Sequence, residues 1–520
     1  MTSPIILATL NSSYHHCAFG LRYLYANLGE LQQSASIVEF TINQNSRDIV
    51  ETILARNPRI VGFGVYIWNT RQTFDVISLL KRIRPGLCVV VGGPEVSFEY
   101  SGQKIVELAD YTICGEADLR FYEFCREFIV ENRRPAEKVL TGPLPEIKAL
   151  KLPYEYYSAE DVKQRVIYVE ASRGCPYKCE FCLSSLDTSV RNFDLTVFLA
   201  AMDDLIARGA KQFKFVDRTF NLSIAYSTQI LRFFLDRMSH DLFLHFELVP
   251  DRLPVELRDL IRQFPAGSIQ FEIGIQTWNP DVAKLVSRRQ DYAKVQENFQ
   301  FLTEETGVHI HADLIAGLPG EDLKSFGRGF DALSGLNPHE IQVGILKRLK
   351  GTPIMRHDTP WEMVYEAAPP FQIISTKVMP FSEVQAINRF AKFWNFYANS
   401  GNFRKTSGYL KVLATKRDDQ SIFGEFFAFT EFLDARHPQR YGIALVNLVE
   451  SAWRYFEAHP HADLAVAREA LVEDYTGSVK RDIPAFLRTD EITDKTNYRK
   501  LTSRLPKRQQ RHMEIPLAAE

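Results

Sequence analysis

The 520-residue sequence predicts an α/β protein with a doubly wound N-terminal domain, a central partial (β/α)6 barrel and a mostly helical C-terminal domain. Three patterns predict this order. Short apolar runs alternate with helical patterns up to residue 134, and the same alternation returns between residues 165 and 355. Beyond about residue 380, apolar residues recur at the spacing of one helix face.

The N-terminal domain is expected to span residues 1–134. Strand-like runs separated by helical patterns predict a parallel, Rossmann-like sheet. In such a sheet, ligands bind at the carboxyl ends of the strands. The predicted strands cover residues 4–10, 35–40, 59–66, 87–91 and 111–114.

A stretch with several prolines and weak periodicity, residues 135–164, is expected to be a linker. The TIM-like barrel is expected to follow over residues 165–355. Its working loops should come after the carboxyl ends of its strands. Its six predicted strands cover residues 166–170, 212–216, 242–248, 268–275, 309–315 and 341–346.

The C-terminal domain is expected to cover residues 356–520. Val384, Ile387, Phe390, Ala391 and Trp394 share one predicted helix face. Further helices are expected over residues 441–456 and 462–475. Basic residues gather between residues 499 and 511, and we expect this tail to be solvated.

Composition limits the compartment and the partners. The net charge of −2 gives no general attraction to nucleic acid or to an anionic membrane. No stretch approaches the ~20 apolar residues of a membrane span, and the first residues contain no basic leader. Seven cysteines are too few and too unevenly spaced for a disulfide scaffold. We therefore expect a cytoplasmic protein without membrane contact, and nucleic acid is not a favoured partner.

Three of the cysteines fall within eight residues, just after a predicted strand: Cys175, Cys179 and Cys182. Three thiolates on one tight loop can bind three irons of a [4Fe–4S] cluster and leave the fourth iron open. Zinc sites more often combine paired Cys-x-x-Cys elements and four ligands, and ferredoxins supply a fourth cysteine nearby. The spacing therefore predicts a metal site for a [4Fe–4S] cluster, with incidental thiols as the alternative.

The Cys-x3-Cys-x2-Cys spacing, with Phe181 before the last cysteine, resembles the signature of the radical S-adenosylmethionine (radical SAM) superfamily. The resemblance covers roughly residues 160–355. It implies reductive cleavage of S-adenosylmethionine to methionine and a 5′-deoxyadenosyl radical, with a reducing partner such as flavodoxin or ferredoxin. The cofactor carries this chemistry, while the protein supplies ligation, orientation and exclusion of water.

Other segments are similar to the parts of that family that contact S-adenosylmethionine. They follow the predicted second, fourth and fifth barrel strands, and Arg288 or Arg289 could pair with the methionine carboxylate. The segment at Asp217 lacks the family's common Gly-Gly-Glu form. Ordinary strand ends, a plain Gly-Pro turn and solvated charges are the alternatives. The resemblance implies these S-adenosylmethionine-binding residues: Phe181, Asp217, Glu272, Gln276, Arg288, Asp313 and Gly317.

The N-terminal domain resembles the cobalamin-binding domain of a large cobalamin-dependent radical SAM subgroup. Glycine-rich turns after the predicted strands would allow a bulky ring to approach the backbone. A domain without cofactor that serves for docking is the alternative. The resemblance implies these cobalamin-binding residues: Tyr14, His15, Gly20, Tyr66, Trp68, Gly92, Gly93, Pro94, Glu95, Gly115 and Glu116.

Some cobalamin domains carry Asp-x-His-x-x-Gly after the first strand, where the histidine binds cobalt. Here Gly20 matches, but His15 stands at the Asp position and Cys17 at the His position. The resemblance therefore implies cobalamin bound without a protein histidine ligand, a variant that favours methyl transfer.

Residues 340–415 resemble a helical domain of unknown function attached to a subset of these proteins. The resulting hypothesis is an enzyme that methylates an unactivated carbon with methylcobalamin. One alternative keeps cobalamin but performs a rearrangement, cyclisation or redox step without methyl transfer. Another is a cobalamin or cluster sensor without turnover. The substrate class stays open among small metabolites, peptides, lipids and RNA.

Overall fold

The computed structural model describes residues 3–437, 442–477, 481–488 and 506–512. These residues divide into two compact units, each described by itself below. Unit 1 comprises Met1–Phe246, Lys347–Met355 and Tyr365–Gln372. Unit 2 comprises Glu247–Leu346, Arg356–Val364 and Ile373–Glu520.

Unit 1 begins with a six-stranded, fully parallel sheet in the order β2-β1-β3-β4-β5-β6. The strand order reverses beside β1, and this reversal opens a crevice at the carboxyl ends of the strands. The first five strands confirm the predicted doubly wound domain, and the two-residue β6 lies in the stretch predicted as linker. The strands are β1 (Ile5–Asn11), β2 (Ala35–Thr41), β3 (Ile60–Gly64), β4 (Cys88–Gly92), β5 (Tyr111–Ile113) and β6 (Val139–Leu140).

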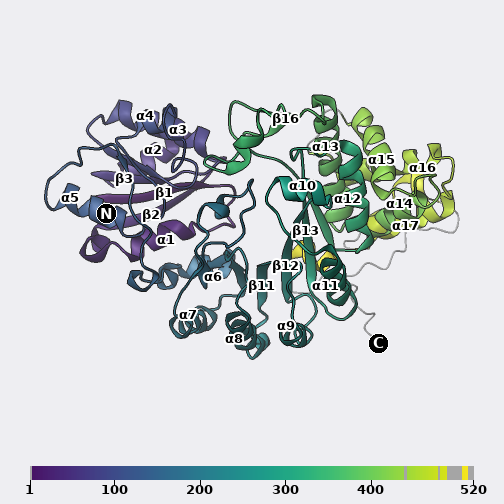
Figure 1. The fold of residues 1–520 in the computed structure, drawn as a ribbon, viewed down its shortest axis with the longest axis horizontal. Coiled ribbons are helices and arrows are strands. Elements are labelled where there is room, and N and C mark those ends of the chain that lie inside the picture. Colours follow the sequence, from purple (N-terminus) through teal and green to yellow (C-terminus); the bar gives the residue numbers. More distant parts are fainter. Residues whose placement is uncertain (1–2, 438–441, 478–480, 489–505, 513–520) are drawn as a thin grey trace. The chain divides into compact units, whose positions relative to one another are not determined.

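Helices cover both faces of this sheet (Figure 1). One face is covered by α2 (Ser46–Leu54), α3 (Thr70–Ile83) and α4 (Lys104–Leu108), and the other by α1 (Phe19–Ala26) and α5 (Arg120–Ile129).

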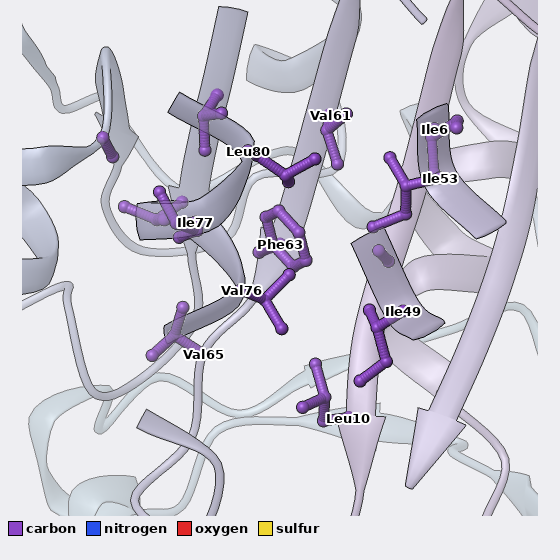
Figure 2. Close-up of a cluster of buried hydrophobic side chains, with 14 of the residues drawn as sticks. Ile6, Leu10, Ile49, Ile53, Val61, Phe63, Val65, Val76, Ile77 and Leu80 are labelled. Atoms are coloured by element: carbon purple, nitrogen blue, oxygen red, sulfur yellow. The ribbon is translucent and has the colours of Figure 1, made fainter. Parts of the chain in front are cut away.

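Helix spacing explains the packing on the first face. Val76, Ile77 and Leu80 form one side of α3 and pack against Val61 and Phe63 of β3 (Figure 2). These side chains are at most 2% exposed. Burial of each such side chain contributes roughly 1.5–3 kcal/mol. This packing therefore holds the carboxyl ends of the strands in place.

The rest of unit 1 contains the first half of the predicted barrel. Its three strands pair in parallel, and an antiparallel hairpin follows the first of them. The strands are β7 (Ile167–Val169), β10 (Gln212–Phe215) and β11 (Phe243–Leu248), with β8 (Ser172–Arg173) and β9 (Arg191–Asn192) in the hairpin. The helices are α6 (Ala159–Gln164), α7 (Leu195–Ala207) and α8 (Ile224–Leu235).

Unit 2 contains the second half of the barrel, again with three parallel strands alternating with helices. Together, the six parallel strands confirm the predicted (β/α)6 pattern. The strands are β12 (Ile269–Gln276), β13 (His309–Ala316) and β14 (Glu340–Ile345). The helices are α9 (Val255–Ile261), α10 (Pro280–Leu285), α11 (Tyr292–Glu304) and α12 (Leu323–Gly335).

The C-terminal part of unit 2 is mostly helical, as predicted. One π-helical turn, Asn395–Asn399, continues α13. The helices are α13 (Phe381–Trp394), α14 (Arg404–Ala414), α15 (Ile422–Arg436), α16 (Leu445–Ala458), α17 (Leu464–Thr476) and α18 (Lys507–His512). Short elements are β15 (Val364–Tyr365), β16 (Ile373–Ser375) and the 3-10 turns Gly29–Ser34, Ile147–Ala149, Tyr154–Tyr156, Leu183–Leu186, Met238–His240, Pro353–His357 and Ala485–Leu487.

The predicted basic tail falls partly outside the described residues, which omit 489–505 and 513–520. The part that is described, α18, is not solvated throughout. Arg508 lies 2.5 Å from the Glu340 carboxylate and donates to the Asn399 carbonyl over 2.9 Å. The ion pair between Arg508 and Glu340 docks this end of the chain on the start of β14, against the sequence expectation. Among the described helices, none has the length and apolar character that a bilayer crossing needs.

Candidate functional site

A cavity of about 270 Å³ lies at the carboxyl ends of β3, β4 and β5 in unit 1. The reversal of strand order beside β1 places the opening there. Residues from α1, from the three strand ends and from the stretch around β7 and β8 form its wall. They include Tyr23, Gly64, Gly92, Gly115 and Arg173.

Glycines keep the floor of the cavity open. Gly93 has a φ of +108°, and a Cβ there would lie 2.6 Å from the Val65 carbonyl oxygen. Gly115 has a φ of +76°, and apart from its chain neighbours no atom of the described residues lies within 4 Å of its would-be Cβ. Only a residue without a side chain fits the first position, and the second leaves space for a ligand.

Six of the residues predicted to bind cobalamin line this cavity: Gly20, Tyr66, Gly92, Gly93, Gly115 and Glu116. Five others lie elsewhere. Tyr14 contacts the Glu160 carboxylate, and His15 is exposed. Trp68 is 51% exposed and stacks on Tyr66 with ring centroids 4.5 Å apart.

The remaining two predicted residues are Pro94 and Glu95, in the turn after β4. Glu95 is 4% exposed, and its carboxylate lies 2.5 Å from the Lys350 ammonium group. Burial raises the pKa of Glu95 in spite of this ion pair. The carboxylate therefore holds residues 347–355 against the turn, and a role in cobalamin binding stays a prediction.

The loop after β1 carries the residue that stands where a cobalt-binding histidine would be. Cys17 is buried, and its Sγ lies 3.8 Å from an Asp161 carboxylate oxygen. Burial raises the pKa of the Cys17 thiol to about 12, so the sulfur stays protonated. His16 is tied to the Tyr168 hydroxyl over 2.6 Å. This loop therefore packs on α6 and β7, and residues 14–17 are not among the residues that line the cavity.

The three clustered cysteines follow β8 on a tight loop. Gly174 has a φ of +91°, and a Cβ there would lie 2.0 Å from the Ser189 carbonyl oxygen. The Cys175 amide donates to the Asp187 carbonyl over 3.0 Å, and the Cys182 amide donates to the Cys179 carbonyl over 3.0 Å. These contacts fix the backbone on both sides of the thiols, and Gly174 tolerates no other residue.

The three thiols lie close enough to influence one another. Burial raises the pKa of Cys175, and the neighbouring Cys182 and Cys179 raise it further. Within the described ranges, no three His, Cys, Asp or Glu side chains converge on a single ion. In a [4Fe–4S] cluster each thiolate binds a different iron, so such convergence is not required. The donor set fits a cluster with three cysteine ligands.

Asp217 follows β10 and was predicted to contact S-adenosylmethionine. Its buried carboxylate accepts hydrogen bonds from the Ala171 amide (3.0 Å) and the Ser172 hydroxyl (2.6 Å). Burial raises the pKa of Asp217 to about 7. The side chain therefore positions the strand that leads into the cysteine loop, and a contact with ligand stays a prediction. Phe181 lies half-buried within that loop.

Unit 2 carries the other predicted S-adenosylmethionine residues. At the end of β12 the strand register shifts between Gly274 and Gln276, and Gln276 has a φ of +71°. Among the residues that the structure describes, its buried Oε1 has no hydrogen-bond partner. Buried polar atoms are rarely left unpaired, so this acceptor is suited to a ligand donor. Glu272 lies half-buried on the same strand.

The Arg288 side chain contacts the backbone at the end of β12. Its Nε donates to the Ile275 carbonyl over 3.0 Å, and its guanidinium also contacts the Gly274 carbonyl. The side chain thus stabilises the irregular end of β12, and pairing with a methionine carboxylate stays a prediction. Arg289 is exposed.

The turn after β13 contains Gly317, where another part of unit 2 packs closely against the backbone. Gly317 has a φ of +85°, and a Cβ there would lie 2.6 Å from Ile373 Cγ2. Asp313 faces His311 across 3.4 Å. Glu321, which the sequence analysis missed, accepts a 2.7 Å hydrogen bond from the Thr277 hydroxyl and so ties the ends of β13 and β12 together. Burial raises the pKa of Glu321 to about 7.

A buried ion network beside the cysteine loop was also not predicted from the sequence. Arg173 Nη1 lies 2.9 Å from both Glu116 and Asp118, and its Nε lies 2.9 Å from Glu170. All four residues line the cavity. The nearest local signal was the pair of opposite charges three residues apart, Glu170 and Arg173, just before the cysteines.

Known families match all three parts of the chain. Residues 5–124 match the B12 binding domain, and residues 169–331 match the radical SAM superfamily. The chain is a radical SAM protein with a B12-binding domain. Residues 359–519 match DUF4080, a protein family of unknown function, and this range overlaps the resemblance over residues 340–415 and falls within the expected C-terminal domain.

This radical SAM protein is similar to curated methyltransferases. It is 24% identical over 333 residues to the 2-(S-pantetheinyl)-carbapenam-3-carboxylate methyltransferase of Streptantibioticus cattleyicolor, covering 55% of this chain and 46% of the relative. It is 23% identical over 331 residues to the cobalamin-dependent radical SAM methyltransferase TokK of Streptomyces tokunonensis, covering 56% and 47%. The chain thus spans about half the length of these relatives.

Solved structures support the fold of this radical SAM protein. The cobalamin-dependent S-adenosylmethionine radical enzyme OxsB, solved with aqua-cobalamin and S-adenosylmethionine bound, has a TM-score of 0.59 at 12% identity. The match covers 91% of this chain and 79% of the OxsB chain. The radical S-adenosylmethionine methyltransferase TsrM from Kitasatospora setae, with cobalamin and a [4Fe–4S] cluster bound, has a TM-score of 0.56 at 18% identity. The match covers 68% of this chain and 74% of the TsrM chain.

Proposed function

We propose that this protein is a cobalamin-dependent radical SAM enzyme that methylates an unactivated carbon, with methylcobalamin as the methyl donor. One observation carries the proposal. Within unit 1, the cavity of the B12-binding domain is bounded by Arg173, which lies two residues before Cys175 of the cysteine loop. The predicted cobalamin site and the predicted cluster site are therefore neighbours. The similarity to curated methyltransferases supports the choice of methyl transfer.

In this proposal, Cys175, Cys179 and Cys182 hold the [4Fe–4S] cluster, which supplies the electron for cleavage of S-adenosylmethionine. The glycines at the ends of β3, β4 and β5 let a corrin ring approach the backbone. The loop after β1 supports cobalamin without a protein ligand, because the buried Cys17 thiol stays protonated and contacts Asp161.

In unit 2, the ends of β12 and β13 carry residues that are proposed to hold S-adenosylmethionine. Gln276 offers a ligand donor its buried oxygen, which has no hydrogen-bond partner among the described residues. Gly317 belongs to the proposed set through the family resemblance, and Ile373 packs against it where a side chain would stand. Glu272, Arg288 and Asp313 are the other proposed residues of unit 2, and Arg288 acts through the backbone that it holds. In unit 1 the proposed residues are Phe181 and Asp217, and Asp217 likewise acts through the backbone that it holds.

A single-turnover experiment tests the methyl transfer. The protein would be purified without oxygen, reconstituted with iron, sulfide and hydroxocobalamin, reduced, and given S-adenosylmethionine. Corrin absorption, iron content, methylcobalamin, S-adenosylhomocysteine and 5′-deoxyadenosine would be measured. Methylcobalamin with one equivalent of S-adenosylhomocysteine is expected even without substrate, because the corrin is methylated before the substrate reacts.

Variants separate the possible outcomes. The triple variant C175A/C179A/C182A should lose iron and 5′-deoxyadenosine, whereas Cys88→Ala, a buried thiol at the start of β4, should keep both. Bound corrin and 5′-deoxyadenosine without methylcobalamin would favour a rearrangement, cyclisation or redox enzyme. Bound corrin and cluster without any nucleoside product would favour a sensor. A protein that retains no corrin would overturn the cobalamin mechanism.

A further inference from the structure

Two sets of contacts in unit 1 join the cysteine loop to the B12-binding domain. The first is the Arg173 bridge, which consists of Arg173, Arg191, Glu116, Asp118, Glu170 and Asp187. The second is the 347–355 strap, a segment that follows the last barrel strand. Both belong to the same compact unit as the cavity and the three cysteines.

The Arg173 bridge starts next to the cysteines. Arg173 precedes Gly174, whose backbone leaves no room for a side chain against Ser189. The Arg173 guanidinium reaches Glu116 and Asp118, in the turn after β5, over 2.9 Å each. It also lies over the Tyr23 ring of α1, 4.5 Å from its centroid. One side chain therefore contacts two walls of the cavity.

A parallel route runs through Asp187. Its carbonyl accepts a hydrogen bond from the Cys175 amide over 3.0 Å, and its carboxylate lies 2.9 Å from Arg191. Arg191 in turn pairs with Glu116. Cys175 and Glu116 are thus connected twice, once through Arg173 and once through Asp187 and Arg191. Charge-assisted pairs of this kind are short and directional, so the two routes fix position as well as distance.

The 347–355 strap contacts both regions at another place. Lys350 lies 2.5 Å from Glu95, and Arg348 lies 2.9 Å from Glu99, both near the turn after β4. Four residues after Lys350, the Ile354 amide donates to the Glu180 carbonyl over 3.0 Å. Glu180 stands between Cys179 and Cys182. The strap therefore ties the turn after β4 to the second half of the cysteine loop.

We propose that Arg173 is a positioning residue that sets the spacing between the cluster and the corrin, with the 347–355 strap as its partner on the other side of the loop. The inference rests on the proposed function, because it assumes that both cofactors bind where the residues suggest. It adds that the spacing is built into unit 1 and does not depend on substrate. Arg173 acts through Glu116 and Asp118, and it touches no reacting atom in this proposal.

Electron paramagnetic resonance offers a readout that a merely structural role would not move. Cob(II)alamin and the reduced cluster are both paramagnetic, so their spin–spin interaction reports their separation. In the loaded native protein we expect one narrow distance distribution. In Arg173→Ala we expect a distribution at least twice as broad, and in the double variant E116Q/D118N we expect the same broadening. Arg173→Lys should restore the distribution only in part, because a compact ammonium group lacks the wide planar fork with which the guanidinium group reaches carboxylates on two sides.

A matched control is the other buried ion network of unit 1, in which Arg165 lies 2.8 Å from Asp161 and pairs with Glu39. None of these three residues lines the cavity. Arg165→Ala should lower stability but leave the distance distribution unchanged. Equal distributions in Arg173→Ala and the native protein would overturn the inference, and so would equal broadening in Arg165→Ala.

Hydrogen exchange on the cofactor-free protein tests the inference even if a cofactor is not retained. Arg173→Ala should raise the exchange rate of residues 172–191 and of residues 115–119 together, by at least tenfold. Arg165→Ala should raise exchange in residues 13–18 and 159–166 instead. Unchanged exchange in residues 115–119 of Arg173→Ala would overturn the inference. If the two variants show these exchange changes but the native protein binds no corrin, the inference stands and the proposed function is overturned.

Discussion

Two buried ion networks in unit 1 use similar residues for different ends. The linker network consists of Arg22, Arg165, Glu39 and Asp161, so it pairs two guanidinium groups with two carboxylates. The Arg173 bridge pairs two guanidinium groups, Arg173 and Arg191, with four carboxylates. Four members of the bridge line the cavity, whereas no member of the linker network does.

The difference in charge balance changes how the carboxylates behave. In the linker network, burial alone would raise the pKa of Asp161, but Arg22, the Ser158 amide and Arg165 outweigh burial and lower it to about 2. In the bridge, burial raises the pKa of Glu170 in spite of the adjacent Arg173. A balanced network stabilises the fold, while an excess of buried carboxylates beside a cavity is characteristic of a functional site. Substitutions in the two networks are expected to have different effects.

The largest effect is expected for Arg22→Ala. Arg22 is 3% exposed and lies 3.1 Å from Glu39 and 2.8 Å from Asp161. Its removal leaves two buried carboxylates with one guanidinium group, which should lower the free energy of unfolding by about 3–5 kcal/mol. Urea unfolding followed by circular dichroism measures this. Arg133→Ala, which removes an ion pair with Glu127 on the surface, serves as the control. Its free energy of unfolding should stay within about 1 kcal/mol of that of the native protein. Equal midpoints for the two variants would contradict the comparison.

A smaller and pH-dependent effect is expected for Asp161→Asn. The folded-state pKa of Asp161 lies below the unfolded value of 3.8. Its contribution to stability is therefore fully present above about pH 4 and is lost as the pH falls towards 2. At pH 7 the substitution should cost roughly 2–3 kcal/mol, and the cost should shrink towards zero in acid. Unfolding of the cofactor-free protein at several pH values measures this, and a cost that does not change with pH would refute it.

The opposite trend is expected for Glu170→Gln in the bridge. Because the folded-state pKa of Glu170 is raised, its ionised form is disfavoured in the fold, and stability falls as the pH rises above the unfolded pKa. Relative to the native protein, Glu170→Gln should therefore become more stable as the pH rises from 4 to 7. The same unfolding series measures both variants. Parallel pH trends for Asp161→Asn and Glu170→Gln would remove the distinction between the two networks.

The smallest effect is expected for His15→Ala. His15 is exposed in the loop that the linker network holds, and it does not line the cavity. Stability should change by no more than about 0.5 kcal/mol. The corrin content after reconstitution should equal that of the native protein. A variant that loses corrin would instead support the sequence prediction that His15 contacts cobalamin.

The sequence predicted the fold because its signals are local. Residues 4–10 were predicted as the first strand, and β1 runs over Ile5–Asn11. Strands β3 and β4 end where glycines follow apolar runs. The two-residue β6 was missed, because so short a strand has no periodic pattern.

The candidate sites could be predicted only in part, because only their local features leave a signal in the sequence. The cysteine spacing and the glycine turns are local, and the turn glycines do line the cavity. Ion pairs between distant residues leave no such trace. Glu95 was assigned from its turn motif, but its partner Lys350 lies 255 residues further along the chain. Glu116 shares Arg173 with Asp118 across more than 50 residues.

The discontinuity of unit 1 has a consequence for synthesis on the ribosome. Because residues 347–355 and 365–372 belong to this unit, it is complete only when 372 of the 520 residues have been translated. Until residue 354 has been translated, Glu95 and the backbone of the cysteine loop lack the contacts that Lys350 and Ile354 of the strap provide. The B12-binding domain therefore emerges first but is finished late, and a gene cut at any single codon before 372 would encode an incomplete unit.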